Sequence, residues 1–567
     1  MNNDPAPDIR HPATVNGKDY DYLFWGPDKT GLALMGVADE RTGIWLATPL
    51  ANPAKRSAAH LAWAGARHSR APGTTERIMA EMGEKGVNPD AKLDEMFRTY
   101  GHTSVGDMAH TNVHFNNVPM HVPMFIFNYG TVVDGQEKST RFQGQFGKAA
   151  LHPLNNYIPD VPPELEAQYQ ALAECSLALF AKVRDAVTPA YERHFRPNSK
   201  DEKKALDARV LDTARASLML GMGTGFSMGT SARDWSRLIG QLRAAPQPFY
   251  RGIGDQIEAL LAPSAEVESA LGALAEAPSL VRHTEPDMTI RNNLERLREH
   301  ATLADLPVHK DQVSQQVYEP CMTSLEAMAA QYLAQVSLRT DFARVVDRIK
   351  GMCSEEKAQL SAIIYSAHDK FRELPSQLTI TSDLSVVLDC DLGVVRDFNR
   401  HRAIGRFIQL PNPLLGTGAT FEEAASLLHT GFILPRYLDL EQFRPERDMF
   451  VDGLKEYYRK ALGFIEASRR TVDAAQRTTG SGDYSFVLNI LPLAQRTTMV
   501  LHFDPKQLNY MTKLRVKPGG HINYRELACI INDVLTDNPL AIGASLALVE
   551  GFERPDAGDR KQFFDRS

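Results

Sequence analysis

The sequence predicts an α+β fold, because short segments with the two-residue period of a strand alternate with longer segments of helical period. Every second side chain is apolar in residues 384–390, and Thr111, Val113 and Phe115 alternate with Asn112 and His114, as in strands with one buried face. Residues 54–66 and 324–337 instead place small apolar side chains at helical spacing. At 567 residues, the chain is long enough for two or three domains, each with its own core.

Composition and charge limit the classes of function. A hydrophobic fraction of 43% and a charged fraction of 23% are ordinary for a soluble globular protein. The formal net charge of −7 argues against general binding of nucleic-acid polymers, but it permits a local basic pocket for a nucleotide. The five cysteines are odd in number and form no C-x-x-C pair, so neither a disulfide framework nor a metal site is expected. No targeting segment or apolar membrane span is visible, and we expect a cytoplasmic protein.

The remaining elements follow from the same patterns. The expected elements are a loose arm over 1–20, one or two short strands over 20–50, a helix from Asn52 that ends near Ser69, a helical connector over 266–307 with proline breaks, and helices over 421–428 and 449–474.

A cluster of basic side chains follows the strand at 384–390. Residues 396–406 contain four arginines and one histidine. Asp391 is a plausible N-cap, so we expect a short helix that carries Arg396 and Arg400 on one face. Like charges at i, i+4 destabilise a helix by roughly 0.2–0.5 kcal/mol per pair, so the cluster needs acidic partners or a bound anion such as a phosphate. From charge alone, an ion-paired or solvated helix is the simpler alternative.

The run Arg396-x-Phe398-x-Arg400-His401-Arg402 resembles the phosphate- and flavin-binding signature of the flavin-dependent thymidylate synthases. In that family the signature continues to a Ser-x-Arg-Tyr segment, which is absent after Arg402. A match to this second half occurs instead in the segment from Glu137 to Phe142, and it is preceded by Gly-His-Thr-Ser at 101–104, similar to the family's Gly-His-Glu-Ser. This first copy has Phe-Asn-Tyr at 127–129 where Arg-His-Arg is expected, so the two degenerate copies are complementary.

Further correspondences indicate an internal repeat. Residues 52–69 and 324–337 both resemble the family's first helix, and residues 212–243 and 484–515 both resemble its late Ala-Arg-x-x-Leu-Pro-Leu region. Arg215 matches the first arginine of that region, whereas the second copy has Leu488 there but keeps Leu-Pro-Leu at 491–493. The resemblance implies a tandem duplication of two similar halves, each a mostly antiparallel sheet with packed helices. The predicted copies are 1–285 and 310–567, with 286–309 as the connector.

The resemblance also implies which residues form the site. The expected flavin-binding residues are His102, Ser69, Arg400, His401, Arg402 and Arg233; the expected nucleotide-binding residues are Arg215, Arg396, Asp397, Arg400 and Arg515; and the expected catalytic residues are Ser139, Arg141 and Glu137. Guanidinium groups suit phosphate oxygens because they donate two parallel charge-assisted hydrogen bonds.

Other roles remain open for several of these side chains. His102 fits a capping or core histidine equally well, and Ser139 fits a turn hydroxyl. We do not expect Ser139 to be a covalent nucleophile, because no general base is identifiable beside it. Glu137 fits an ion-pair partner of Arg141 equally well. Asp397 stands where the family usually has glutamine, and an acceptor-only carboxylate would favour a base with an additional donor, although it could equally pair with Arg400 or Arg141.

By resemblance, the protein would bind FAD, use NADPH and methylenetetrahydrofolate as co-substrates, and methylate C5 of a deoxyuridylate-like nucleotide. The same chemistry on a different nucleotide or heterocycle is an alternative, and a flavin- or nucleotide-binding protein without turnover is another. The family is tetrameric, so two fused copies imply a homodimer that resembles that tetramer.

Overall fold

The computed structural model describes residues 6–29, 31–50, 52, 55–69, 74–100, 103–129, 134–139, 151–158, 160–299, 314–318, 324–336, 340–365, 384–410, 420–479, 484–535 and 553–565. The chain forms two compact units. Unit 1 comprises Met1–Val118, Gly130–Lys138 and Gly223–Met288, and unit 2 comprises Pro119–Tyr129, Ser139–Met222 and Thr289–Ser567. Each unit is built from several separate stretches of the chain. The two sequence copies at 1–285 and 310–567 remain a prediction.

Unit 1 is organised around a seven-stranded sheet with the order β1-β2-β3-β4-β5-β7-β6. Strands β1 to β5 pair antiparallel in succession, and β6 pairs antiparallel with β7. Its strands are β1 (Ile9–Val15), β2 (Lys18–Trp25), β3 (Ala33–Asp39), β4 (Ile44–Leu50), β5 (His110–Pro119), β6 (Asp134–Glu137) and β7 (Gly223–Ser231). The expected loose arm over 1–20 was therefore wrong, because β1 pairs with β2 along its whole length.

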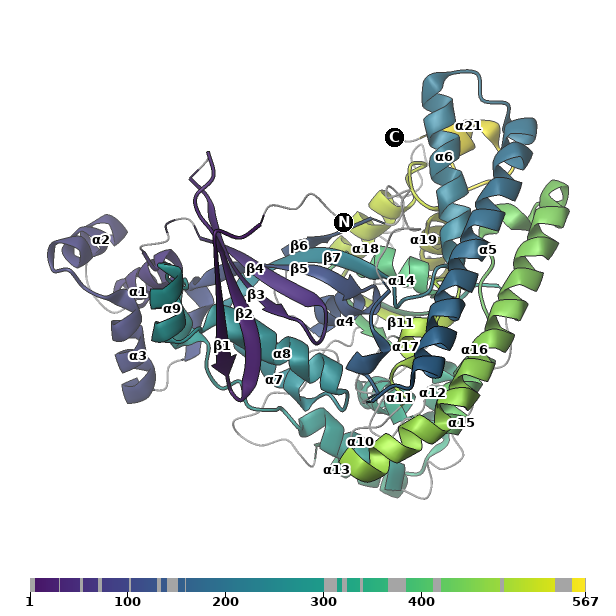
Figure 1. Cartoon of the computed structure of the whole chain (residues 1–567). Coiled ribbons are helices and arrows are strands. Elements are labelled where there is room, and N and C mark those ends of the chain that lie inside the picture. Colours follow the sequence, from purple (N-terminus) through teal and green to yellow (C-terminus); the bar gives the residue numbers. More distant parts are fainter. Residues whose placement is uncertain are drawn as a thin grey trace. The chain divides into compact units, whose positions relative to one another are not determined.

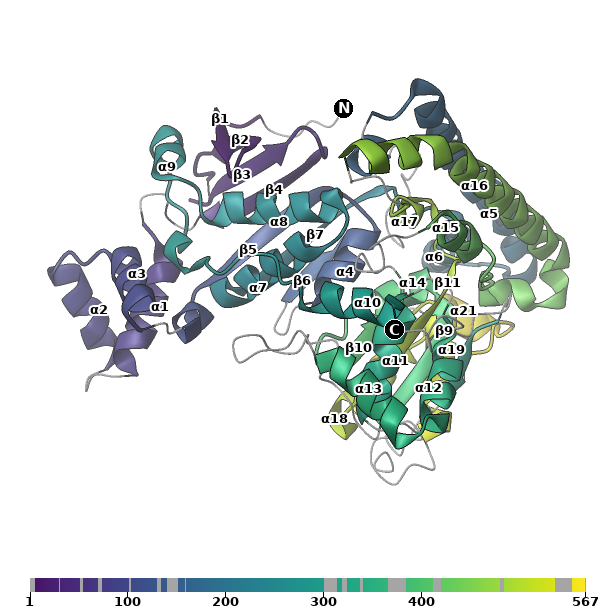
Figure 2. The same cartoon turned by 90° about the horizontal axis from the view of Figure 1, so that it is seen from below.

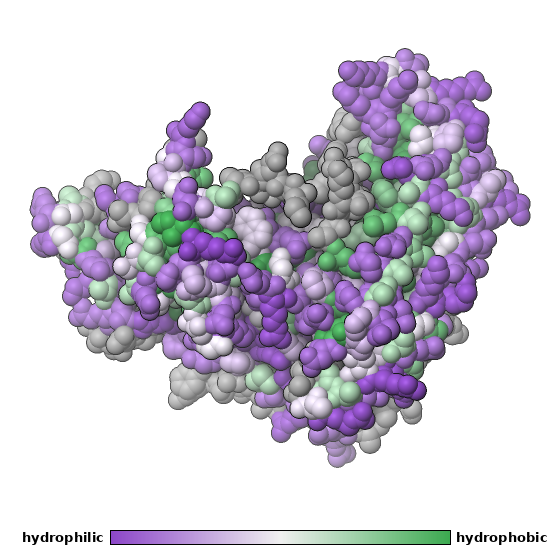
Figure 3. All heavy atoms as spheres, viewed as in Figure 1, coloured by the Kyte–Doolittle hydropathy of each residue, from purple (hydrophilic) through white to green (hydrophobic). Residues whose placement is uncertain are grey.

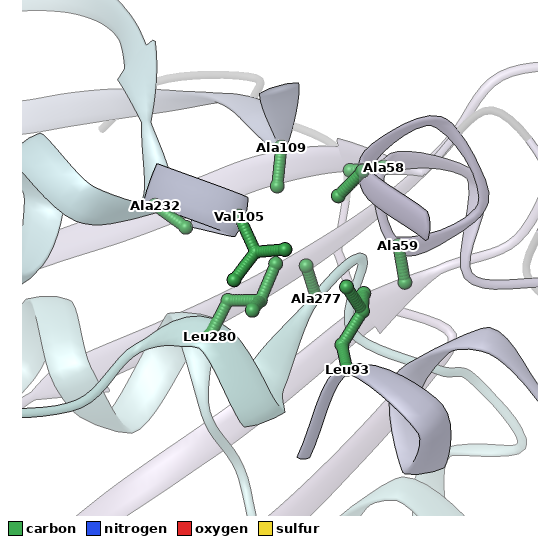
Figure 4. Packing of buried hydrophobic residues seen from close by; sticks show 9 residues of the cluster. Ala58, Ala59, Leu93, Val105, Ala109, Ala232, Ala277 and Leu280 are labelled. Carbon is green, nitrogen blue, oxygen red and sulfur yellow. The ribbon is translucent and has the colours of Figure 1, made fainter. Parts of the chain in front are cut away.

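Helices pack against this sheet and against one another. They are α1 (Ser57–His68), α2 (Thr75–Glu84), α3 (Pro89–Tyr100), α7 (Ala232–Ala244), α8 (Pro248–Leu261) and α9 (Ala265–Leu271). Figure 2 shows α7 and α8 lying along the sheet. Small side chains of α1, including Ala58 and Ala59, point toward Leu93, Val105 and Leu280 in one buried cluster (Figure 4). The alanine-rich sequence of α1 allows this close packing.

Unit 2 contains a four-stranded antiparallel sheet with the order β8-β9-β11-β10. Its strands are β8 (Gln316–Tyr318), β9 (Leu384–Asp391), β10 (Gly405–Ile408) and β11 (Arg496–Phe503). The predicted strand at 384–390 is confirmed as β9, but the expectation of one buried face was wrong, because every residue of β9 is buried. Polar side chains on its second face find buried partners: Asp389 binds Arg496 and Thr498. Pairing of this kind makes a buried charge tolerable.

Helices make up most of unit 2. They are α4 (His121–Tyr129), α5 (Pro163–Phe195), α6 (Lys200–Ala214), α10 (Thr289–Glu299), α11 (Ser324–Val336), α12 (Phe342–Gly351), α13 (Ser354–Tyr365), α14 (Leu392–Phe398), α15 (Phe421–Leu427), α16 (Arg444–Thr479), α17 (Val487–Ile490), α18 (Pro505–Arg515), α19 (Ile522–Leu535) and α21 (Arg560–Phe564). The long helices α5 and α16 run side by side (Figure 1). Their outward surface is mainly hydrophilic in the view of Figure 3.

A short main-chain pairing joins two segments of unit 2 that are far apart in sequence. The N–H of Leu220 donates to the carbonyl of Leu491, and the N–H of Leu493 donates to the carbonyl of Leu218, each at 2.8 Å. Met219 and Pro492 form an antiparallel bridge between these two bonds. Both segments are buried, so these bonds give partners to main-chain N–H and carbonyl groups that would otherwise be buried without one.

The α+β class is confirmed, with antiparallel sheets and many helices. The helices expected over 421–428 and 449–474 are present as α15 and α16. The helical connector expected over 266–307 contains α10 and most of α9. Within the described part of the chain, none of the helices has the length and apolarity that crossing a membrane requires.

Candidate functional site

The basic cluster lies where β9 passes into α14. Asp391 caps this helix, because its Oδ1 accepts from the N–H of Val394 at 2.8 Å, and its Oδ2 accepts from Asn523 at 3.1 Å. Burial raises the pKa of the Asp391 carboxyl, and these two donors oppose that shift. The predicted N-cap is therefore confirmed.

The helix ends earlier than the sequence suggests. It stops at Phe398, and Arg400 lies in the following turn rather than on the same helical face as Arg396. Arg396 is buried, and its guanidinium lies 3.2 Å from the sulfur of Met120. The side chain of Arg400 is 44% exposed, so the two arginines stand in different environments. Like-charge repulsion along α14 is avoided in this way.

A pocket of about 500 Å³ opens beside this turn. Its walls are residues 400–403, the helix α18, the loop between α18 and α19, and Tyr524 of α19. Four of the lining side chains are cationic, namely Arg400, Arg402, Arg515 and Lys517, and none of the described lining residues is acidic. In a chain with a net charge of −7, this local excess of positive charge favours an anionic ligand.

His401 and Arg515 form the buried wall of the pocket. Arg515 Nε donates to His401 Nε2 at 2.5 Å, and a terminal nitrogen of Arg515 donates to the carbonyl of Asp397, also at 2.5 Å. Burial, with Arg515 and Arg406 nearby, lowers the pKa of His401 to about 3. His401 is therefore neutral near pH 7 and accepts through Nε2, so it orients Arg515 instead of adding another positive charge.

A second arginine of the cluster has a structural role. Arg406 is buried and donates to Asn399 Oδ1 at 2.6 Å, to the carbonyl of His401 at 3.3 Å and to the carbonyl of Phe127. Burial lowers the pKa of Arg406 to about 9. These bonds fix the turn that presents Arg400 and Arg402 to the pocket.

Arg402 takes its orientation from an aromatic ring. Its guanidinium carbon lies 4.4 Å from the centroid of Phe127, which is within the range of a cation–π contact. Phe127 occupies the position where the first predicted copy lacks an arginine. An aromatic residue from α4 thus supports an arginine that lines the pocket.

Four of the five predicted nucleotide-binding residues meet at Asp397. This carboxylate is buried, binds Arg215 at 3.2 Å and lies 3.9 Å from Arg400. Arg215 also lies 4.0 Å from Asp212. The structure thus brings Arg215, Asp397, Arg400 and Arg515 together. The sequence required either acidic partners or a bound anion for the basic cluster, and Asp397 is such an acidic partner for part of it.

Other predicted site residues lie elsewhere or are not described. Ser69 follows α1 in unit 1, where its hydroxyl donates to the carbonyl of Ala66 at 2.9 Å, and Arg233 pairs with Asp107 at 3.3 Å. Glu137 ends β6 in unit 1, and Ser139 is a half-buried residue of unit 2. His102 and Arg141 fall outside the described residues. All six assignments stay predictions.

Gln507, Tyr510 and Lys517 are among the lining residues that sequence reasoning missed. Tyr510 is 59% exposed, which is high for so large a side chain, and its ring lies edge-on to His401 at 5.9 Å. Lys517 precedes the Pro-Gly-Gly turn at 518–520, and this basic, glycine-rich turn after a helix was the available signal.

The chain is similar in sequence to a curated protein and in structure to solved proteins. A UPF0159 protein of Chlamydia pneumoniae is 22% identical over 459 residues, which cover 78% of this chain and 77% of that protein. Among solved structures, a UMP/dUMP methylase, PolB, from Streptomyces cacaoi, bound with 5-Br dUMP, is similar over 42% of this chain and 97% of its own, at 16% identity and a TM-score of 0.24. No protein-family model matches the chain.

Proposed function

We propose that the protein is a flavin-dependent enzyme that transfers a one-carbon unit to C5 of a deoxyuridylate-like nucleotide. The observation that carries this proposal is the meeting of Arg400, His401, Arg402 and Arg515 at one cationic pocket. These residues come from the two segments in which the sequence resembles the flavin-dependent thymidylate synthases.

The pocket suits a phosphorylated flavin. Its volume of about 500 Å³ lies within the usual range of 300–1,000 Å³ for ligand pockets. Arg400, Arg402 and Lys517 would hold phosphate oxygens through charge-assisted hydrogen bonds, and the exposed ring of Tyr510 offers an apolar wall. When bound, FAD would supply the hydride and one-carbon transfer chemistry that amino-acid side chains lack.

The protein's own residues would bind and orient the reactants. Neutral His401 accepts from Arg515 and so directs the remaining donors of that guanidinium. Phe127 holds the guanidinium plane of Arg402, and Asp397 holds Arg215. Such preorganisation spares the ligand the cost of ordering these side chains.

We further propose that the two halves descend from a tandem duplication. In the first sheet, four consecutive strands have the order β4-β5-β7-β6, and the second sheet has the order β8-β9-β11-β10. In each half, the helix α4 or α14 directly follows β5 or β9, and α7 or α18 directly follows β7 or β11. The 33-residue α5 and the 36-residue α16 precede β7 and β11 respectively. These parallels support the predicted copies at 1–285 and 310–567.

The proposal is tested with purified protein supplied with FAD, NADPH, methylenetetrahydrofolate and dUMP. We expect one dTMP to form for each NADPH consumed, with the nucleotides measured by chromatography and NADPH by its absorbance. Parallel reactions with dCMP and UMP identify a different acceptor. Binding of FAD without product from any nucleotide would leave a flavoprotein and contradict the proposed enzyme.

A further inference from the structure

A buried arginine outside the predicted site holds the wall of the pocket. Arg209 of α6 is 2% exposed and donates to four main-chain carbonyls: to Gly520 and Pro518 at 2.7 Å, and to Phe563 and Asp565 at 3.1 Å. Asp212, 3.8 Å away on the same helix, balances its charge. A guanidinium that binds four carbonyls in a fixed fork fixes the path of the main chain.

Two of these carbonyls belong to the turn that lines the pocket. A Cβ atom at Gly520 would overlap the ring of Tyr524, so any larger residue there would displace that ring. Tyr524 in turn lies under Arg515, with the guanidinium carbon 5.2 Å from the ring centroid. Arg515 then binds His401. A continuous series of contacts therefore leads from Arg209, through Gly520 and Tyr524, to the cationic wall.

The same helix reaches the pocket by a second route. Arg209, Asp212 and Arg215 follow one another at intervals of three residues, so they lie along one side of α6 and its final turn. Asp212 lies near both arginines, and Arg215 binds Asp397, whose carbonyl accepts from Arg515. Both routes end at Arg515, which is thus supported on two sides from α6.

We propose that Arg209 is a positioning residue of the anion pocket, which sets Lys517 and Arg515 by clamping the Pro518–Gly520 turn between α6 and the segment 553–565. This inference rests on the proposed function only in requiring that the pocket bind an anionic ligand. Arg209 does not line the pocket, and its effect on a ligand passes through Gly520 and Tyr524.

The test compares two arginines that anchor the same segment. Arg560 donates to the carbonyls of Phe195 at 2.7 Å and Arg196 at 3.0 Å, and to Glu202, without contact to the 518–520 turn. FAD and inorganic pyrophosphate are titrated into wild-type, Arg209→Gln and Arg560→Gln full-length protein, and each variant's thermal midpoint is measured. We expect Arg209→Gln to weaken both probes at least tenfold, and Arg560→Gln to change them less than twofold even where it lowers the midpoint.

Further variants keep the inference testable if Arg209→Gln does not fold. Gly520→Ala leaves Arg209 in place but displaces the Tyr524 ring, so it should weaken both probes in the same way. Tyr524→Leu removes the ring beneath Arg515 and should also weaken both probes. Wild-type affinity in folded Arg209→Gln, or in Gly520→Ala, overturns the inference. Failure of the wild type to form dTMP while it binds both probes refutes the proposed enzyme alone.

Discussion

The amide of Leu220 donates to the carbonyl of Leu491 at 2.8 Å, and the counterparts of these residues in the predicted copies, Leu493 and Leu218, form the same bond in reverse. Antiparallel pairs exchange bonds in this way, and here the bridged residues themselves, Met219 and Pro492, occupy counterpart positions in the predicted copies. This pairing joins the end of the first copy's Arg215 region to the second copy's Leu-Pro-Leu segment, next to the residues that gather around Asp397.

Hydrogen exchange checks this pairing. The N–H groups of Leu220 and Leu493 are buried and equivalent, so both should exchange only when unit 2 unfolds. We therefore expect similar, near-maximal protection for both amides by mass spectrometry or NMR. Rapid exchange at one amide and slow exchange at the other would contradict an equivalent, reciprocal pairing.

Much of the site was predictable from local sequence patterns. The contacts that hold its arginines in place were not. The β9 strand, the Asp391 cap and the basic turn follow from alternation, capping chemistry and charge density in one short stretch. The contacts of Arg402 with Phe127 and of Arg215 with Asp397 join residues more than 180 positions apart. Contacts at such separation leave no local period. Strand β1 was missed because its one proline and its polar residues obscure the alternation that pairing with β2 imposes.

Arg402→Ala tests the phosphate contacts. Removing the guanidinium should cost a charge-assisted hydrogen bond of about 1.5–3 kcal/mol, which corresponds to roughly tenfold or more in the Kd of FAD. Quenching of flavin fluorescence on binding measures that change. Unchanged affinity in a folded Arg402→Ala protein would remove this arginine from the flavin site.

Lys517 and Lys513 provide a matched pair of variants for testing the pocket. Both lysines are exposed and lie at or just beyond the end of α18, but of the two only Lys517 lines the pocket. We expect Lys517→Gln to weaken pyrophosphate binding several-fold and to reduce its dependence on salt. Lys513→Gln, with the same loss of charge, should have little effect. Equal effects in isothermal titrations would show that overall charge, rather than the pocket, attracts the anion.

The Arg215–Asp397 pair should contribute to folding. Asp397→Asn leaves a buried guanidinium with a weaker partner, and we expect a loss of stability on the order of 3 kcal/mol in urea unfolding. The exposed pair of Arg554 and Asp533 is the control, and Asp533→Asn should cost less than about 1 kcal/mol. Similar losses in the two variants would argue against a special role for the buried pair.

Acid should destabilise unit 2 before most carboxylates protonate. Burial lowers the pKa of His121 and His502 to about 4 and that of His401 to about 3. Below the usual histidine pKa near 6.5, the unfolded chain takes up protons that the folded chain does not, so stability falls with falling pH until these folded pKa values are passed. The raised pKa of Asp391 acts in the opposite sense.

From pH 6.5 to pH 5, each of these histidines should cost about 2 kcal/mol of unfolding free energy. Urea unfolding at a series of pH values measures the slope, and His502→Gln should reduce it by one histidine's share. His502 contacts Ser385 and Gln331, so glutamine can keep polar contacts there. A stability that does not change between pH 7 and pH 5 would contradict neutral buried histidines.

The number of flavins bound per chain tests the central claim most directly. The second predicted copy carries Arg-His-Arg at 400–402, and the segment that matches the family's Ser-x-Arg-Tyr lies in the first copy at 137–142, so one complete flavin site should form for each chain, with two in the expected homodimer. Calorimetric titration of FAD into the apoprotein should therefore give one FAD per chain, and Arg400→Ala should abolish or greatly weaken that single binding event. Two equivalent flavins per chain, or no binding of FAD at all, would contradict the account.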